Sequence, residues 1–183
     1  MALSALSGDE QEILFVQLCN PLDPGIAVAL ASVSNELRTA TRAPLQQLKT
    51  DHKAAAALCR KLGHRNCKAL REAKRVEWRY KGLTADELKL LGKLGSVLPA
   101  LETLNLYEPA ASPDGGRQLA AGLGAGALPA VTWFRIYNTH VGDAGASALA
   151  ASLGQGALPR LKHLILDRTA IGDAGLVLSL IHI

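Results

Sequence analysis

A nine-residue phrase that recurs every 30 residues constrains the fold of this chain more than any other feature. Its copies occupy residues 98–106, 128–136 and 158–166, and each begins with Leu-Pro and continues with apolar residues at matching positions. A fixed period of this length is typical of proteins built from stacked units, because each unit buries its apolar side only against its neighbours. The second half of the chain is therefore predicted to be a row of similar units rather than one closed core.

Each unit is predicted to contain a short strand, a loop and a helix. In the first copy of the phrase, Leu104 and Leu106 alternate with polar residues, which indicates a strand with one buried face. The later loops end in Gly-Asp-Ala-Gly, where Asp143 or Asp173 can cap the N-terminus of a helix. Small residues and spaced leucines follow Asp143, as expected of a helix, and the glycines of residues 154–156 end it.

This arrangement resembles the leucine-rich repeat family, in particular its ribonuclease-inhibitor-like subtype with a long helix and a Gly-Asp-x-Gly turn. The resemblance covers about residues 73–178. It implies an α/β fold, a leucine-rich repeat solenoid with parallel strands inside and helices outside. The family commonly places Asn or Cys three residues after the last strand leucine, where this chain has Pro109, Thr139 and Thr169. A Thr hydroxyl can satisfy the loop backbone there, whereas Pro cannot, so we expect the first loop to have its own geometry.

The chain is predicted to have three parts. Residues 1–63 form a helical segment, residues 64–97 a basic linker with a degenerate capping repeat, and residues 98–183 the leucine-rich repeats. The last repeat is incomplete, because His182 stands where its helix should place a leucine. We therefore interpret the chain as a fragment of a longer parent or as one with an aberrant terminus, and a natural end is the alternative.

Three amphipathic helices with short connections are predicted in the first part, which indicates a small bundle. The first covers Glu12 to Leu18, the second opens after Asp23, and the third runs from Ala43 to Leu62. The apolar face of the second helix consists of Ile26, Leu30, Val33 and Leu37.

Residues 11–40 are similar to the F-box, a helical motif that couples substrate-binding domains to a cullin-type ubiquitin ligase through the Skp1 adaptor. The residues that this resemblance would place against a Skp1-type adaptor are Leu18, Pro21, Leu22, Leu30 and Val33. The same side chains are also what a helical hairpin needs to pack on itself. A plain helical cap for the repeats therefore stays open as the alternative.

The outward residues of the strands are the predicted binding site, because stacked strands bring them together on one concave face. The candidate contact residues are Tyr107, Trp133, Arg135, Tyr137, His163 and Asp167. Trp, Tyr and Arg are the residue types that most often dominate binding energy. Phe134 and Ile136 already fill the inward positions of the middle strand, which excludes a core role for its aromatic neighbours. The alternative is that these aromatic residues only stabilise the surface of the sheet.

Positive charge is concentrated between residues 60 and 81, which hold nine Lys or Arg and two Glu. Such a segment can follow a phosphate backbone, and it can equally be a solvated helix that leads into the repeats. Only Trp78 and Tyr80 are available there to stack on bases, so the sequence does not favour a nucleic-acid partner.

Three cysteines, Cys19, Cys59 and Cys67, lie outside the repeats. Their odd number and wide spacing favour reduced thiols over a disulfide framework. Cys59, His64 and Cys67 lack the paired spacing of a zinc site, so neither a metal nor a cofactor is predicted.

The histidines stand in different contexts, and none is joined to a recognisable catalytic pattern of Ser, Cys or carboxylate. The first residues lack the apolar stretch of a secretory signal, and no run approaches the roughly 18 apolar residues of a membrane span. We therefore expect an intracellular protein, cytoplasmic or nuclear. Its expected role is a non-enzymatic interaction module that binds another protein on the concave face. The alternatives are an F-box-type substrate-recognition subunit of a ubiquitin ligase and a regulator of a small GTPase or nuclease.

Overall fold

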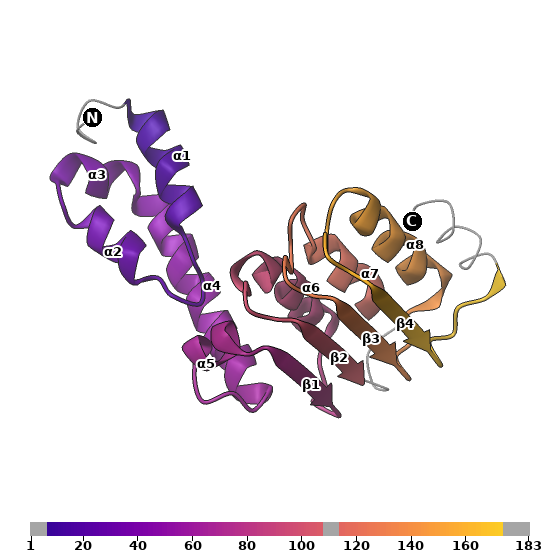
Figure 1. The fold of residues 1–183 in the computed structure, drawn as a ribbon. Coiled ribbons are helices and arrows are strands. Elements are labelled where there is room, and N and C mark those ends of the chain that lie inside the picture. Colours follow the sequence, from indigo (N-terminus) through magenta and orange to yellow (C-terminus); the bar gives the residue numbers. More distant parts are fainter. Residues whose placement is uncertain (1–6, 108–113, 174–183) are drawn as a thin grey trace.

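The computed structural model describes residues 7–107 and 114–173 of the chain. A group of helices lies at one end, and a parallel sheet covered by further helices lies at the other (Figure 1). The helices are α1 (Gly8–Leu18), α2 (Gly25–Ala31), α3 (Asn35–Ala40), α4 (Arg42–Lys61), α5 (Cys67–Glu72), α6 (Ala85–Leu94), the 3-10 helix η2 (Gly95–Val97), α7 (Gly115–Gly122) and α8 (Gly142–Gly154). The strands are β1 (Arg75–Arg79), β2 (Thr103–Tyr107), β3 (Trp133–Tyr137) and β4 (His163–Asp167).

The four strands form one parallel sheet in the order β1-β2-β3-β4. Each strand pairs with the next at matching positions, so Trp133 lies opposite Thr103 on one side and His163 on the other. The hydrogen bonds before the strands repeat as well, since the carbonyl of Thr132 accepts from the backbone N–H of Lys162 at 2.9 Å. The predicted α/β class and the predicted parallel strands are therefore confirmed.

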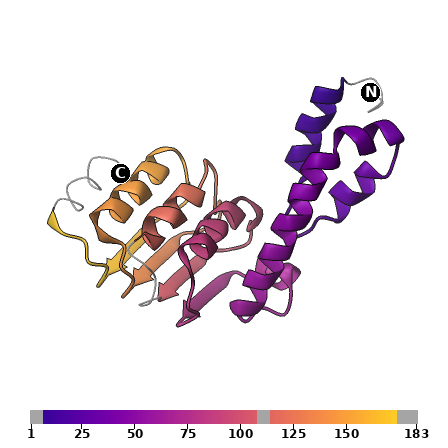
Figure 2. The same ribbon diagram turned by 180° about the vertical axis from the view of Figure 1, so that it is seen from behind.

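Helices α6, α7 and α8 cover one face of the sheet, and no described helix covers the other face (Figures 1 and 2). The inward residues of the two central strands point to these helices and are at most 3% exposed, namely Leu104, Leu106, Phe134 and Ile136. Parallel sheets need such a cover, because each crossover lays a helix on the sheet. Leu164 and Leu166 continue the alternation on β4, where they are half-buried.

The prediction that Asp143 caps the following helix is wrong. α8 already begins at Gly142, the residue before Asp143, and no side chain caps its N-terminus. Gly142 adopts a left-handed φ of 63°, which places Asp143 inside the first turn rather than at the flanking position that a cap needs. The Asp143 carboxylate instead accepts a hydrogen bond of 2.7 Å from the backbone N–H of Gly172. Asp143 thus links two consecutive units, while the helix expected after Asp173 lies outside the described residues.

The threonines at the position where the family commonly has Asn or Cys are both buried. Thr139 is 5% exposed and Thr169 is 3% exposed. The Thr139 hydroxyl donates to the carbonyl of Tyr137 at 3.2 Å, so it satisfies loop backbone as expected. Pro109 and the geometry of its loop lie outside the described residues.

The N-terminal segment contains more helices than predicted. α1 begins earlier than expected, because Ser7 and Glu10 form a reciprocal capping box. The predicted second helix is split into α2 and α3, because the Ser34 hydroxyl accepts from the backbone N–H of Leu37 at 3.1 Å and starts a new helix. The predicted third helix is confirmed as α4.

The split also changes which residues face the core. Ile26 and Val33 were predicted to be buried, but they are 64% and 70% exposed, whereas Ala27 and Ala31 are buried. α5 lies inside the predicted basic linker, where the side chain of Asn66 caps its first turn.

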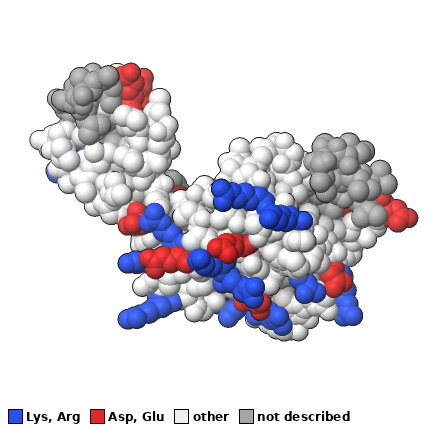
Figure 3. Space-filling model, viewed as in Figure 1, with Lys and Arg blue, Asp and Glu red and all other residues white. Residues whose placement is uncertain are grey.

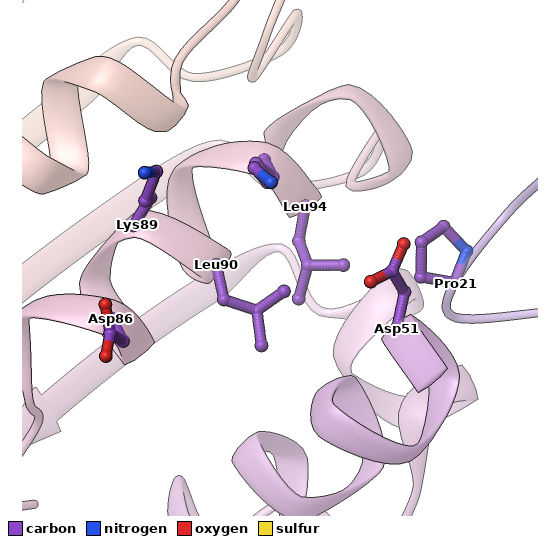
Figure 4. Close-up of a pocket in the computed structure, with 7 residues that line it drawn as sticks. Pro21, Asp51, Asp86, Lys89, Leu90 and Leu94 are labelled. Atoms are coloured by element: carbon purple, nitrogen blue, oxygen red, sulfur yellow. The ribbon is translucent and has the colours of Figure 1, made fainter. Parts of the chain in front are cut away.

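Two hydrophobic cores are present in the described part of the chain. The larger core runs under the sheet and reaches the N-terminal helices at Leu22, Leu58 and Leu62. The smaller core lies between α1, α2 and α4 and consists of Phe15, Ala27, Ala31 and Leu48. A hollow of about 130 Å³ separates Pro21 and Asp51 from the facing residues of α6 (Figure 4). The N-terminal helices are therefore joined to the rest mainly through Leu22 and the end of α4.

The predicted incomplete repeat cannot be compared with the structure, because residues 174–183, His182 among them, lie outside the described residues. No helix in the described part combines the length and the apolar character that crossing a membrane requires.

Candidate functional site

The strand register brings the predicted contact residues together on the uncovered face of the sheet, called the open face below. The open face consists of Arg75, Glu77 and Arg79 of β1, Thr103, Asn105 and Tyr107 of β2, Trp133, Arg135 and Tyr137 of β3, and His163, Ile165 and Asp167 of β4. Trp133 is 37% exposed, and its ring lies 4.7 Å from that of His163. All six predicted residues therefore share one surface, although their role in binding stays a prediction.

A row of three tyrosines crosses the open face where the strands end. Tyr80 and Tyr107 meet edge to face with ring centres 4.6 Å apart, and Tyr107 stacks on Tyr137 at 4.9 Å. Such contacts fix large side chains before a partner arrives, which lowers the entropic cost of binding. Tyr80 was missing from the predicted contact residues. It follows β1 with a left-handed φ of 53°, so the alternation along the strand does not include it.

Hydrogen bonds lock the tyrosine row further. The Tyr80 hydroxyl donates to the Tyr107 hydroxyl at 2.8 Å, and the side-chain amide of Asn138 donates to the same oxygen at 3.3 Å. The bond from Tyr80, aided by the one from Asn138, lowers the pKa of Tyr107. The same bond raises the pKa of Tyr80, because its proton is held by the neighbouring oxygen.

Two arginine side chains lie next to Tyr137, at one end of the tyrosine row. The guanidinium groups of Arg135 and Arg168 lie 5.1 and 5.7 Å from the centre of the Tyr137 ring, within the range of cation–π attraction. Arg135 also pairs with Asp167 at 3.5 Å. Lys and Arg, interspersed with Asp and Glu, gather at the sheet end of the molecule, whereas the visible surface of the N-terminal helices carries few charges (Figure 3).

A hollow of about 290 Å³ lies on the open face and is lined by Arg79, Asn105, Leu106, Tyr107, Arg135 and Tyr137. Two buried atoms on its lining residues, Nε of Arg135 and Oδ1 of Asn105, have no hydrogen-bond partner among the residues that the structure describes. A buried donor and a buried acceptor without partners cost free energy that a ligand can relieve. The hollow thus spans β1, β2 and β3.

The five residues predicted to bind a Skp1-type adaptor do not form one exposed surface. Leu22 is 5% exposed and belongs to the larger core, so the prediction that it contacts an adaptor is wrong. It packs into the core that α4 shares with the sheet. Leu18 and Val33 are exposed, whereas Pro21 and Leu30 are half-buried.

Large apolar side chains are nevertheless exposed on the first helices. They are Ile13, Leu14, Val16 and Leu18 of α1, Ile26 and Val28 of α2, and Val33 after the end of α2, called the exposed apolar residues below. A helix that is apolar on several sides is normally buried, yet of the apolar side chains of α1 only Phe15 belongs to a core.

The basic segment of residues 60–81 is partly neutralised. Lys61 pairs with Glu87 at 2.6 Å, and Arg71 pairs with Asp23 at 3.2 Å. Trp78, which the sequence suggested for stacking on bases, is 1% exposed and belongs to the larger core. Trp78 occupies an inward position of β1, so it is not available to stack on bases.

Cys59, His64 and Cys67 lie near one another without the arrangement of a metal site. The indole N–H of Trp78 donates to Nε2 of His64 at 3.4 Å, which occupies that nitrogen. Across residues 7–107 and 114–173, no three His, Cys, Asp or Glu side chains are placed to hold a metal ion together.

The sequence matches no protein-family model and has no significant match among curated proteins.

Proposed function

We propose that this chain is a leucine-rich repeat protein of the ribonuclease-inhibitor-like subtype, and that it binds another protein on its open face without enzymatic activity. The repeat assignment is supported by strands that pair at a 30-residue interval and by helices that all lie on the same side of the sheet. The N-terminal helices then cap the first edge of the sheet, as the ends of stacked-repeat proteins require.

The observation that carries the proposal is the side-chain order along β3. Trp133, Arg135 and Tyr137 point to the open face, while the residues between them are buried. Large aromatic and arginine side chains are thus presented without being used by the core. Residues of these types contribute most to binding when a partner removes them from water.

Affinity capture with variants of the open face tests the proposal. The wild type, Trp133→Ala and Tyr137→Ala are immobilised at equal density, exposed to one cell extract, and the bound proteins are quantified by mass spectrometry. We expect the same partners to be retained by the wild type and reduced more than tenfold by either variant, because loss of such an anchor costs about 2 kcal/mol or more.

Arg117→Ala is the control for this comparison. Arg117 lies on α7, on the covered side of the sheet, where its pairing with Asp114 is exposed. It should bind like the wild type. Equal capture by all four proteins would show that the open face is not the binding site.

An F-box-type role in a ubiquitin ligase is the second candidate, and the exposed apolar residues favour it. Exposed apolar patches of this kind commonly mark sites of protein association. A pull-down with a purified Skp1-type adaptor separates this candidate from a plain helical cap. Under the F-box role the wild type binds, and Leu18→Asp or Val33→Asp abolishes binding.

Both substituted positions are exposed, so these variants should keep the fold. Leu22→Asp is unsuitable for the same purpose, because it would place a charge in the core and unfold the protein. Failure of the wild type to bind the adaptor would exclude the F-box role and leave the helical cap.

A further inference from the structure

Two of the three cysteines face each other away from the open face. Cys59 lies near the end of α4, and Cys67 is the first residue of α5. Between them the chain reverses at Gly63, whose φ is 87°. The thiol of Cys59 donates to the sulfur of Cys67, and the two Sγ atoms are 3.6 Å apart.

Both cysteines are buried, but Cys67, at 7% exposed, borders a hollow on the surface. Cys59 is fully buried, and burial raises the pKa of its thiol to about 12. Cys67 instead lines an open hollow of about 480 Å³, together with Arg60, Arg65 and Lys68. A small solute such as hydrogen peroxide can therefore reach Cys67 through this hollow.

We propose that Cys59 and Cys67 form an oxidation site, in which a peroxide converts the two thiols into a disulfide within one chain. In the first step the Cys67 thiolate attacks one oxygen of hydrogen peroxide, the O–O bond breaks, and hydroxide leaves. The oxygen that was attacked stays on the sulfur with its hydrogen, so Cys67 becomes a sulfenic acid.

In the second step the sulfur of Cys59 attacks the sulfur of Cys67. The S–O bond breaks, the disulfide bond forms, and the oxygen leaves as water with the proton of the Cys59 thiol. The two thiols lose two electrons in total, and the peroxide gains them as it is reduced to water.

The backbone can accommodate the new bond with a small movement. The sulfurs must approach from 3.6 Å to about 2.05 Å, the length of a disulfide. α5 has only six residues and follows a turn, so its first residue can move towards α4 without disturbing the strands. The bond would hold α5 against α4 where the N-terminal helices meet the sheet.

Peptide mapping of the full chain after peroxide treatment tests the proposal. Trypsin cuts after Arg60 and after Arg65, so Cys59 and Cys67 fall in separate peptides, residues 54–60 and 66–68. The reduced protein is treated with a tenfold excess of hydrogen peroxide, its remaining thiols are alkylated, and the digest is analysed without reductant. We expect a linked pair of these two peptides, and a fall in free thiols from three to one per chain.

Two single variants complete the test. Cys19→Ser should still form the linked peptide, whereas Cys59→Ser should leave Cys67 to be trapped as a sulfenic acid by dimedone. The proposal is overturned if the wild type keeps all of its thiols, if Cys67 is oxidised while Cys59 stays free, or if the linked peptide contains Cys19. Circular dichroism of each variant verifies that it is folded.

Discussion

Two glycines determine how closely α6 and α7 pack. A Cβ atom built on Gly92 of α6 would clash with the carbonyl oxygen of Leu119 and lie 2.9 Å from the Cα of Gly122. A Cβ on Gly122 would in turn clash with the carbonyl oxygen of Lys89. Both positions therefore exclude any side chain, because the neighbouring atoms belong to a helix backbone that must move as a whole.

We expect Gly92→Ala to lower the free energy of unfolding by about 1–3 kcal/mol, because the added methyl group forces the two helices apart. Urea unfolding followed by circular dichroism measures the change. Gly124→Ala is the control, since its Cβ would meet no atom within 4 Å. It should leave stability unchanged or raise it by less than about 1 kcal/mol. Similar losses in the two variants would contradict the close packing described here.

Single residues were most predictable inside the strands. The alternation of buried and outward residues correctly assigned Trp133, Arg135 and Tyr137 to one face, because a strand has only two faces. The same rule places Trp78 of β1 inside, where it is 1% exposed. Tyr80 could not be found in this way, because its left-handed backbone lies beyond the end of the strand.

At the scale of elements, an ion pair joins α4 to α6. Lys61 lies 2.6 Å from the Glu87 carboxylate, which also accepts a backbone hydrogen bond of 2.8 Å from Thr84. Partial burial raises the pKa of Glu87, but the hydrogen bonds from Lys61 and Thr84 outweigh it and hold the pKa below its ordinary value of 4.5. The charged carboxylate is therefore more favourable in the folded chain than in the unfolded chain.

Glu87→Gln should lower the free energy of unfolding by about 0.5–1 kcal/mol at pH 7, because it removes the ion pair while the amide oxygen can still cap the helix. A lowered folded-state pKa means that the contribution of Glu87 is complete above about pH 4.5 and is lost as the pH falls through the folded value. Urea unfolding at pH 7 and pH 3 should therefore show a difference from the wild type that shrinks at the lower pH.

Glu72→Gln is the control for this series. Glu72 pairs with Lys68 at 3.9 Å, and both side chains are well exposed. This substitution should have little effect at either pH. A loss at pH 7 as large as that of Glu87→Gln would indicate a general charge effect instead of a link between α4 and α6.

Long helices with a clear amphipathic period were predicted well from the sequence, and short helices were not. α4 carries a long amphipathic pattern, so its start and end were recognised within a few residues. The division between α2 and α3 depends on one hydroxyl, that of Ser34, which competes with the apolar spacing that runs through this region. α5 is too short to display a period and is specified mainly by the cap at Asn66.

At the scale of the whole molecule, the two hydrophobic cores differ greatly in size. The larger core includes buried residues from β1, β2 and β3, with Leu164 and Leu166 of β4 packed against it, whereas the smaller core around Phe15 holds four buried residues. A unit with so few buried apolar residues opens at a lower free energy than the rest of a protein. We therefore expect α1 to α3 to open while the sheet stays folded.

Phe15→Ala and Phe134→Ala test this difference, because the two side chains are 0% and 1% exposed and each removal should cost about 3–5 kcal/mol. In hydrogen-exchange mass spectrometry, Phe15→Ala should speed exchange in α1 to α3 and leave β2 and β3 protected. Phe134→Ala should speed exchange in the strands. Loss of protection throughout the chain in Phe15→Ala would mean that the two cores unfold as one.

The matching register of the strands bears on how such a chain can change its length. Leu128 and Leu158 adopt left-handed φ values of 54° and 48° at the same place in consecutive units, and β3 pairs with β4 residue for residue. A segment cut at these two leucines carries its own strand and helix. A tandem duplication of residues 128–157 in the gene would therefore add one strand and one helix. The units on either side of the insertion would pack against the same kind of surface that they contact now. Growth by whole units would widen the surface offered to a partner without requiring a new fold.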